Sequence, residues 1–408
     1  MNRSILFSTS FPLRESRAKL SESRRGAITP LAALMLVPLL GMVAFSVDLG
    51  WISLTKAQLQ NSADSAALAA AEQLMSGYVQ YNTPLQPQQG SIVATSKASA
   101  ITYAQQFAGY NSAGGIGSLA LNGGDVVFGY TGSNGTFTPG NGSSGFPNTV
   151  QVTMRRDSSA NGVLPLFFAP VLGTNSVSMT VSAAATIYNA SSISSFNTSA
   201  GINGMLLPVA LDQNHWNQFC LNGASPDGNV YPDSNGVPQL QVYPSPGNAP
   251  GNFGLLCVGP PQNNVPAFRS WIDNGPSSCD LSYLANNYLL PATAESPKAW
   301  KGGPGLKSTL QSNFAGIVGL PRLMPIFAPI TTSPYQAASG QGSNTYYNIV
   351  GFVGVKITQA TGNGSNMNIS VEPCAVLDPT AIYTTSTVIP AGSSSQFTTT
   401  FAPPKLTQ

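Results

Sequence analysis

The longest run of apolar residues lies near the start of the chain, from Ala27 to Val47, with only Thr29 and Ser46 as polar side chains. As an α-helix, these roughly 21 residues span about 32 Å, which matches the hydrocarbon core of a bilayer, about 30 Å thick. Pro30 falls in the first turn, where proline is tolerated, and Pro38 falls in the interior. The pattern therefore predicts a membrane-spanning helix, and its partner is the lipid bilayer.

Charged residues fix the expected orientation of this helix. Arg24 and Arg25 precede the apolar run, and Asp48 follows it. Because basic residues stay on the cytoplasmic side, we expect a basic cytoplasmic tail over 1–26 and a single transmembrane helix over 27–50. The rest of the chain then lies outside the cytoplasm, as a periplasmic or extracellular body held at the inner (cell) membrane. A cleaved signal peptide is the alternative, since residues 44–46 resemble a cleavage site.

A helical pattern continues past the apolar run. One narrow stripe of mostly small residues recurs at helical spacing. Its members are Ile52, Leu59, Ala63, Ala66, Ala70 and Leu74. We expect one long helix from about residue 27 to 76, ending near Gly77. Small side chains allow helices to approach closely, and two alternatives stay open: packing against partner proteins, or packing onto the chain's own domain.

The body of the chain divides by composition into two parts. A second helix is expected near 92–107, followed by strands at 126–128, 150–154 and 177–183, which gives a helical stalk with a small α+β domain over 51–188. A Ser/Asn/Gly-rich linker over 189–204 leads to a mostly β domain over 205–390, with a hairpin joining 229–231 to 240–243. A Ser/Thr/Pro-rich tail, 391–408, is expected to fray. The predicted fold class is α+β.

Composition narrows the classes of function. Only 8% of the residues are charged, against about 25% in ordinary soluble domains. The net charge of +2 comes from the N-terminal tail, so the body has no basic stripe of the kind that binds phosphate backbones. We therefore expect no nucleic acid as a partner.

Four cysteines occur, all in the second half of the chain and none in a CxxC pair: Cys220, Cys257, Cys279 and Cys374. An even number in an exported domain favours disulfides, with three pairings open. Buried free thiols are the alternative. A zinc site is disfavoured, because the spacings are wide and His215 is the one histidine.

Catalytic motifs are missing from the sequence. It has no HExxH, no GxSxG and no paired CxxC. His215 with Asp212 is chemically sensible as a base and its orienter, but no other catalytic group accompanies the pair. Asp227 and Asp233 fit turns better than calcium ligands. We therefore expect no enzyme activity, no cofactor, no metal and no small-molecule substrate.

The N-terminal motifs resemble one known family. They are the Arg24-Arg25-Gly26 start, the apolar run, the Val47-Asp48-Leu49-Gly50 junction and the helix containing Ala63-Asp64-Ser65-Ala66-Ala67-Leu68-Ala69-Ala70-Ala71. Together they are similar to the N-terminal region of the TadG-like family of the Flp, or tight-adherence, pilus machinery. Looser similarity continues at 161–173, 321–327 and 347–353.

The resemblance implies a membrane-anchored, pilin-like or pilus-assembly protein, with other Flp/Tad pilus or pseudopilin proteins as partners and no catalytic residues. It also implies a processing site between Gly26 and Ala27. True pilins carry Glu at the fifth position after the processing Gly, where this chain has Leu31. Some relatives carry a DxSxS metal site, and the nearest string, Asp280 to Leu284, lacks the last Ser.

The sequence thus predicts a pilin-like minor component or assembly factor of the Flp/Tad pilus that acts by protein–protein packing outside the cytoplasm. One alternative is an anchored structural or adhesive surface protein that works apart from pili. An exported hydrolase is a weaker alternative.

Overall fold

The structure is a computed structural model. It describes residues 28–85, 88–140, 145–190, 192–243, 253–260, 264–288, 297–304, 307–328, 338–339, 345–362, 367–383, 386–388 and 398–407. The chain forms two compact units: residues 1–51 with 165–176, and residues 52–164 with 177–408. The basic tail 1–26, Gly26 and Ala27 lie outside the described residues.

The first unit contains the beginning of a long helix and one loop. Helix α1 runs from Ile28–Asn82 with Pro38 inside it, and its first part, as far as Trp51, belongs to this unit. The loop 165–176 carries the 3-10 helix η2 (Ala169–Leu172) and is flanked by the paired strands β4 (Leu164–Pro165) and β5 (Ser176–Val177). The apolar sequence at 164–172 predicts a short helix or an apolar loop, and the structure has a short 3-10 turn there.

Helix α1 extends beyond the predicted end at Gly77, and that boundary was wrong. A Cβ atom on Gly77 would collide with the side chain of Ser96, on the second helix. The glycine therefore serves the close approach of two helices, and it stops neither of them. The helix ends instead near Thr83, whose backbone N–H and hydroxyl both donate to the carbonyl of Val79.

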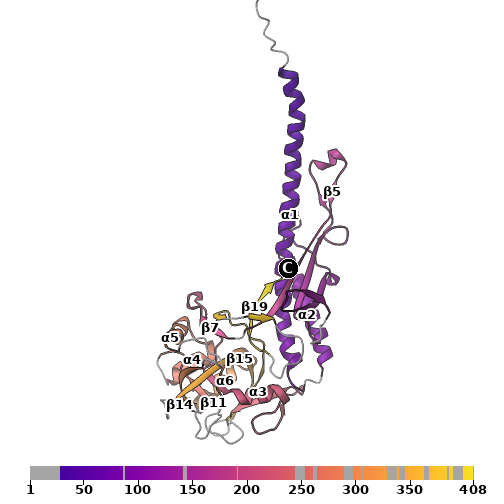
Figure 1. The fold of residues 1–408 in the computed structure, drawn as a ribbon. Coiled ribbons are helices and arrows are strands. Elements are labelled where there is room, and N and C mark those ends of the chain that lie inside the picture. Colours follow the sequence, from indigo (N-terminus) through magenta and orange to yellow (C-terminus); the bar gives the residue numbers. More distant parts are fainter. Residues whose placement is uncertain are drawn as a thin grey trace, which may run out of the picture. The chain divides into compact units, whose positions relative to one another are not determined.

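The second unit begins with the rest of α1, helix α2 (Gln89–Gly109) and a six-stranded antiparallel sheet. The sheet order is β18-β6-β3-β1-β2. Strand β19, which is labelled in Figure 1, also pairs with β6. Its strands are β1 (Val126–Thr131), β2 (Phe137–Pro139), β3 (Thr149–Arg156), β6 (Met179–Ala190), β18 (Ser386–Val388) and β19 (Phe401–Leu406), with the 3-10 turn η1 (Gly123–Asp125) before β1. The predicted second helix and the three predicted strands are all present.

The end of the chain belongs to this first sheet, so the expected fraying is wrong for residues 401–406. Strand β19 pairs with β6, and the side chain of Phe401 is fully buried. Phe401 meets the ring of Tyr78 on α1 edge-on, with ring centroids 6.1 Å apart. A polar segment frays when none of its apolar residues is buried. In this segment Phe401 is buried against Tyr78, so the strand stays in place.

The predicted linker over 189–204 is also structured in large part. Strand β7 (Ile193–Phe196) pairs with β17 (Ala381–Tyr383), and the turn η3 (Thr198–Ala200) follows it. Ile193 and Phe196 are buried. Two apolar residues at the ends of a four-residue segment are thus enough to dock it, although Ser and Asn surround them.

A nine-stranded mixed sheet forms the rest of the second unit, in the order β12-β11-β8-β13-β15-β16-β10-β9, with β14 paired to β15. Its strands are β8 (Val209–Asp212), β9 (Tyr231–Pro232), β10 (Pro238–Tyr243), β11 (Phe253–Leu256), β12 (Lys298–Pro304), β13 (Pro321–Phe327), β14 (Ala338–Ser339), β15 (Thr345–Thr361) and β16 (Asn368–Pro373). Strands β8 and β13 are parallel, whereas the other pairs are antiparallel. The predicted hairpin is present as β9 and β10.

Helices accompany this sheet more often than the sequence suggested. They are α3 (Gln213–Asn222), α4 (Val265–Asn274), α5 (Ser278–Tyr288), η4 (Ser308–Leu310) and α6 (Gln311–Gly316). The sequence near 267–271 and 306–314 predicts two short helices, which α4 and α6 match, while α3 and α5 were missed. The α+β fold class is confirmed.

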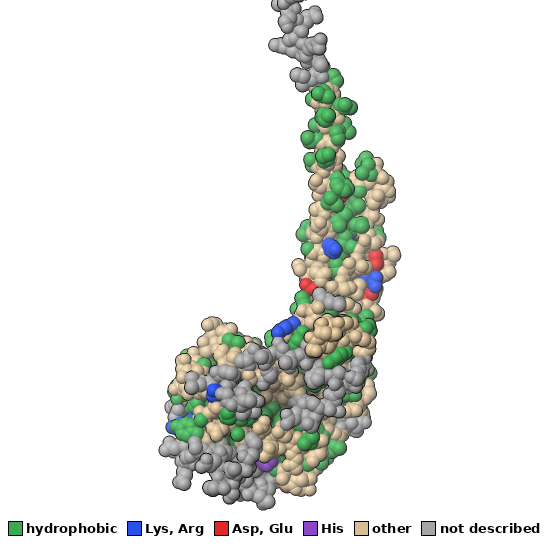
Figure 2. Space-filling view, in the orientation of Figure 1, with side chains coloured by type: hydrophobic (Ala, Val, Ile, Leu, Met, Phe, Trp, Pro, Cys, Tyr) green, Lys and Arg blue, Asp and Glu red, His purple; other side chains and the backbone are tan. Residues whose placement is uncertain are grey.

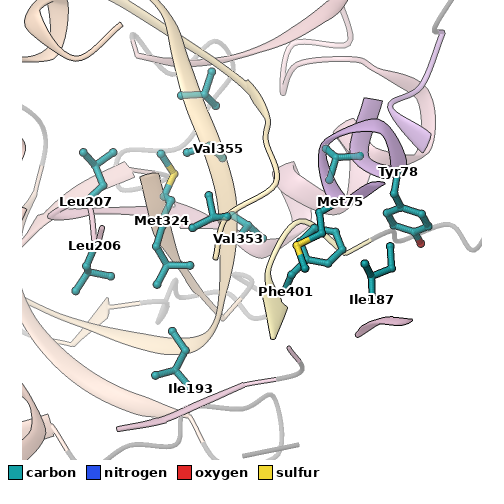
Figure 3. Close-up of a cluster of buried hydrophobic side chains, with 14 of the residues drawn as sticks. Met75, Tyr78, Ile187, Ile193, Leu206, Leu207, Met324, Val353, Val355 and Phe401 are labelled. Carbon is teal, nitrogen blue, oxygen red and sulfur yellow. The ribbon is translucent and has the colours of Figure 1, made fainter. Parts of the chain in front are cut away.

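The two sheets of the second unit share one continuous apolar core. Figure 3 shows Met75 and Tyr78 of α1 beside Phe401, and Val353 and Val355 of β15 beside Met324. This core joins the nine-stranded sheet to the six-stranded sheet and to helices α1 and α2.

Candidate membrane anchor and helix-packing surfaces

The first part of α1 exposes apolar side chains on every face. Its most exposed large residues are Val37 (72%) and Met42 (73%), and the helix is long and apolar enough to cross a membrane. Figure 2 shows the hydrophobic side chains along this segment. A helix that is apolar all round, with nothing packed over it, is stable in lipid and not in water. The predicted span is thus placed on an exposed helix.

Asp48, at the end of the span, fastens the loop 165–176. One carboxylate oxygen accepts the backbone N–H of Phe167 at 2.8 Å, and the other accepts those of Phe168 at 3.0 Å and Ala169 at 2.6 Å. Asp48 is only 3% exposed. Hydrogen bonds from three amides to one carboxylate are charge-assisted and therefore stronger than neutral ones. The sequence identified Asp48 only as the end of the apolar run, and its role as a clamp was missed.

The loop held by Asp48 presents apolar side chains beside the helix. Val171 is 88% exposed and Leu172 is 81% exposed. The ring of Phe167 lies 5.7 Å from that of Trp51. A groove of about 460 Å³ lies between Phe168 to Leu172 and the last turns of the span, from Leu40 to Phe45. Its walls are almost entirely apolar.

The stripe of small residues predicted as a packing face lies inside the chain's own domain. Leu59, Ala63, Ala66, Ala70 and Leu74 are all fully buried, and Ile52 is half-buried. Helix α2 is bound to α1 by hydrogen bonds from Ser62 to the carbonyl of Ala108 and from Asn111 to the hydroxyl of Ser65. Of the two alternatives, the structure therefore supports packing onto the chain itself.

A buried arginine braces the loops next to this stripe. Arg156 is 4% exposed and donates to the carbonyls of Gly114 at 2.9 Å and Gly162 at 3.1 Å, and also to that of Asn161. Burial lowers the pKa of Arg156. At Gly114, with φ +55°, a Cβ atom would meet Leu164 and Thr55, so the loop fits closely on α1. The sequence offered only one signal for this role, a basic residue in an alternating strand.

No disulfide joins the four cysteines in the structure, and their pairing remains a prediction. Cys220 on α3 and Cys257 after β11 are buried, Cys374 after β16 is half-buried and Cys279 on α5 is exposed. Each lies on a different element, and an even count says nothing about distance. Burial raises the pKa of the Cys220 thiol to about 12.

The remaining sequence candidates for chemistry have structural roles. Asp212 caps α3 by accepting the N–H of Asn214 at 2.7 Å; burial raises the pKa of Asp212 and lowers that of His215. Asp227 and Asp233 accept backbone N–H groups two residues further along, as turn residues do. Among the described residues, no group of three or more His, Cys, Asp or Glu side chains is placed to hold a metal ion.

Two family models match the part of the chain that contains the exposed helix, the stripe and strands β1, β2 and β3 of the first sheet. Residues 26–73 match the putative Flp pilus-assembly TadE/G-like family, and residues 54–186 match the putative Tad-like Flp pilus-assembly family. The N-terminal part of this chain, over residues 26–186, is therefore similar to the Tad-like Flp pilus-assembly families. No curated protein and no solved structure gives a significant match.

The Tad-like matches cover the features that this site is built from. The first spans the exposed helix and Asp48, and the second spans α2, Arg156 and the loop 165–176. They confirm the resemblance seen at 161–173. Because they end at residue 186, the similarity seen at 321–327 and 347–353 remains a prediction. A role related to Flp pilus assembly follows for the chain.

Proposed function

We propose that this chain is a single-pass protein of the inner membrane that serves the Flp/Tad pilus as a pilin-like minor component or assembly factor. The observation that carries the proposal is the exposed apolar start of α1, within a segment that matches the TadE/G-like model. The helix fixes the protein at the membrane where pili are assembled. The body outside the cytoplasm then contacts pilus subunits or envelope partners.

The contact surface for those partners is not the small-residue stripe, because five of its six members are buried in the chain's own core. The exposed residues of α1 past the span, such as Leu54 and Lys56, belong to a different face of the helix and remain free of that core. The protein therefore acts by packing and positioning, without a chemical step, and lipid and pilus proteins are its partners.

Deletion of the gene with complementation tests this proposal. We expect the deletion strain to lose surface pili and adhesion, and the full chain to restore both. A complementing variant with Val37→Asp and Met42→Asp should fail, since two carboxylates in the span block insertion. Normal pili in the deletion strain contradict the pilus role, and loss of adhesion alone favours the alternative of an adhesive surface protein.

The identity of the mature N-terminus tests the processing expected at Gly26 and Ala27. Leu31 stands where true pilins carry Glu, so we propose that the basic tail 1–26 is not removed. Sequencing the protein from purified membranes should then find residues before Gly26. A mature chain that begins at Ala27 contradicts a retained tail and indicates pilin-type processing, whereas a start near Val47 contradicts a retained anchor.

A further inference from the structure

The loop 165–176 lies at the level of the membrane span, not beyond it. The groove beside this loop is lined on the helix side by Leu40, Val43, Ala44 and Phe45, all of them within the predicted span. At 1.5 Å per residue, Leu40 lies about 12 Å along the helix from Asp48. Lipid that covers the last turns of the span must therefore also meet the loop.

The composition of the loop suits lipid. From Pro165 to Ser176 it has no charged side chain, and its exposed edge is formed by Phe168, Val171 and Leu172. An apolar surface of this kind on a loop is costly in water. Interfacial segments with such an edge bury it about 5–10 Å into the boundary of headgroups and acyl chains.

The backbone of the loop is unusually well satisfied for a short irregular segment. Asp48 takes the N–H groups of Phe167, Phe168 and Ala169. Carbonyl oxygens within the loop take those of Leu166, Val171, Gly173 and Thr174. Pro165 and Pro170 have no N–H. Non-helical backbone can approach hydrocarbon only when its donors are paired within the protein, and this loop meets that condition.

We propose that the loop 165–176 inserts its Phe168, Val171 and Leu172 edge into the outward-facing leaflet of the membrane that α1 crosses, so that acyl chains fill the groove. The partner is lipid, because the groove continues the lipid-facing surface of the span without a break. The inference rests on the membrane anchoring in the proposed function. It gives the protein a second membrane contact besides its helix, and the Asp48 clamp joins the two.

Depth measurement with spin labels on the full chain in lipid nanodiscs tests this inference. Cys279→Ser and Cys374→Ser remove the more accessible thiols, and a nitroxide is then attached at Val171→Cys. Val37→Cys supplies the lipid reference and Asn134→Cys, on the exposed turn between β1 and β2, the water reference. Because Val171 is 88% exposed, a label there disturbs no packing.

We expect the label at residue 171 to lose its accessibility to a water-soluble nickel complex, as the label at 37 does, while the label at 134 keeps it. A label at 171 as accessible to nickel as that at 134, with 37 protected, overturns the inference and leaves the anchor intact. Nickel access at residue 37 itself contradicts the anchor. Protection at 171 only in discs with two copies, with dipolar broadening between labels, assigns the groove to a second copy and also overturns the inference.

Discussion

The carboxylate of Asp48 accepts the backbone N–H of Ala169 at 2.6 Å, so the first residue after the apolar run is fixed to a loop about 120 positions further along the chain. The same side chain holds the N–H groups of Phe167 and Phe168. One acidic residue directly after the apolar run thus pairs three amides of a remote loop.

Asp48→Ala should release the loop 165–176 without unfolding the rest of the chain. A hydrogen bond to a charged group contributes about 1.5–3 kcal/mol, so losing the acceptor leaves three amides unpaired and favours local opening. Hydrogen exchange of the 166–176 peptide should accelerate. Asp64→Ala is the matched control on the same helix, since Asp64 accepts a hydrogen bond from Gln60 on that helix, and its replacement should leave that peptide unchanged. If Asp48→Ala leaves the exchange of this peptide unchanged, Asp48 does not hold the loop 165–176 in place.

Ala66→Leu should destabilise the isolated protein, because Ala66 is fully buried. Overpacking a close-packed core costs about 1–3 kcal/mol, which thermal unfolding in detergent can measure. Ala57→Leu, at an exposed position of the same helix, is the control and should change stability little. If the stripe instead binds partner proteins, Ala66→Leu should leave the stability of the isolated protein normal and weaken pilus assembly.

Phe401→Ala should detach the C-terminal strand from the first sheet. Removing a buried phenylalanine costs about 3–5 kcal/mol, and the ring contact with Tyr78 is lost with it. Limited proteolysis should then cut near residue 400 in the variant and not in the native chain. Leu406→Ala on the same strand is the control, since Leu406 is 42% exposed. If protease cuts the native protein and Phe401→Ala equally, the native C-terminal strand is frayed, as its composition predicted, and the docking of Phe401 is contradicted.

The thiols should differ in reactivity in a defined order. Exposed Cys279 should react first with a thiol reagent at pH 8, whereas Cys220 should stay protected, because burial holds its pKa at about 12 and leaves almost no thiolate. In denaturant without reductant, all four cysteines should titrate. If fewer than four thiols titrate in freshly denatured protein, some of the cysteines are joined by disulfides.

The sequence was most informative where one physical force dominates. The uncharged run up to Val47 and the strand at 150–154 each follow from burial or lipid contact of neighbouring residues, and each was predicted. Asp48 and Arg156 were missed as clamps because their partners are backbone groups of remote loops, which leave no pattern in composition. Gly77 was misread for the same reason, since only the approach of Ser96 explains it.

The measurement that tests the account most directly is the position of Cys279 relative to the membrane. In cells carrying the Cys374→Ser variant, a membrane-impermeant maleimide should label Cys279 on spheroplasts before lysis, and the labelled chain should stay in the membrane pellet after a carbonate wash. Cys279→Ser should abolish the label. Labelling only after lysis, or recovery of the intact chain in the soluble fraction, would contradict an anchored protein whose body lies outside the cytoplasm.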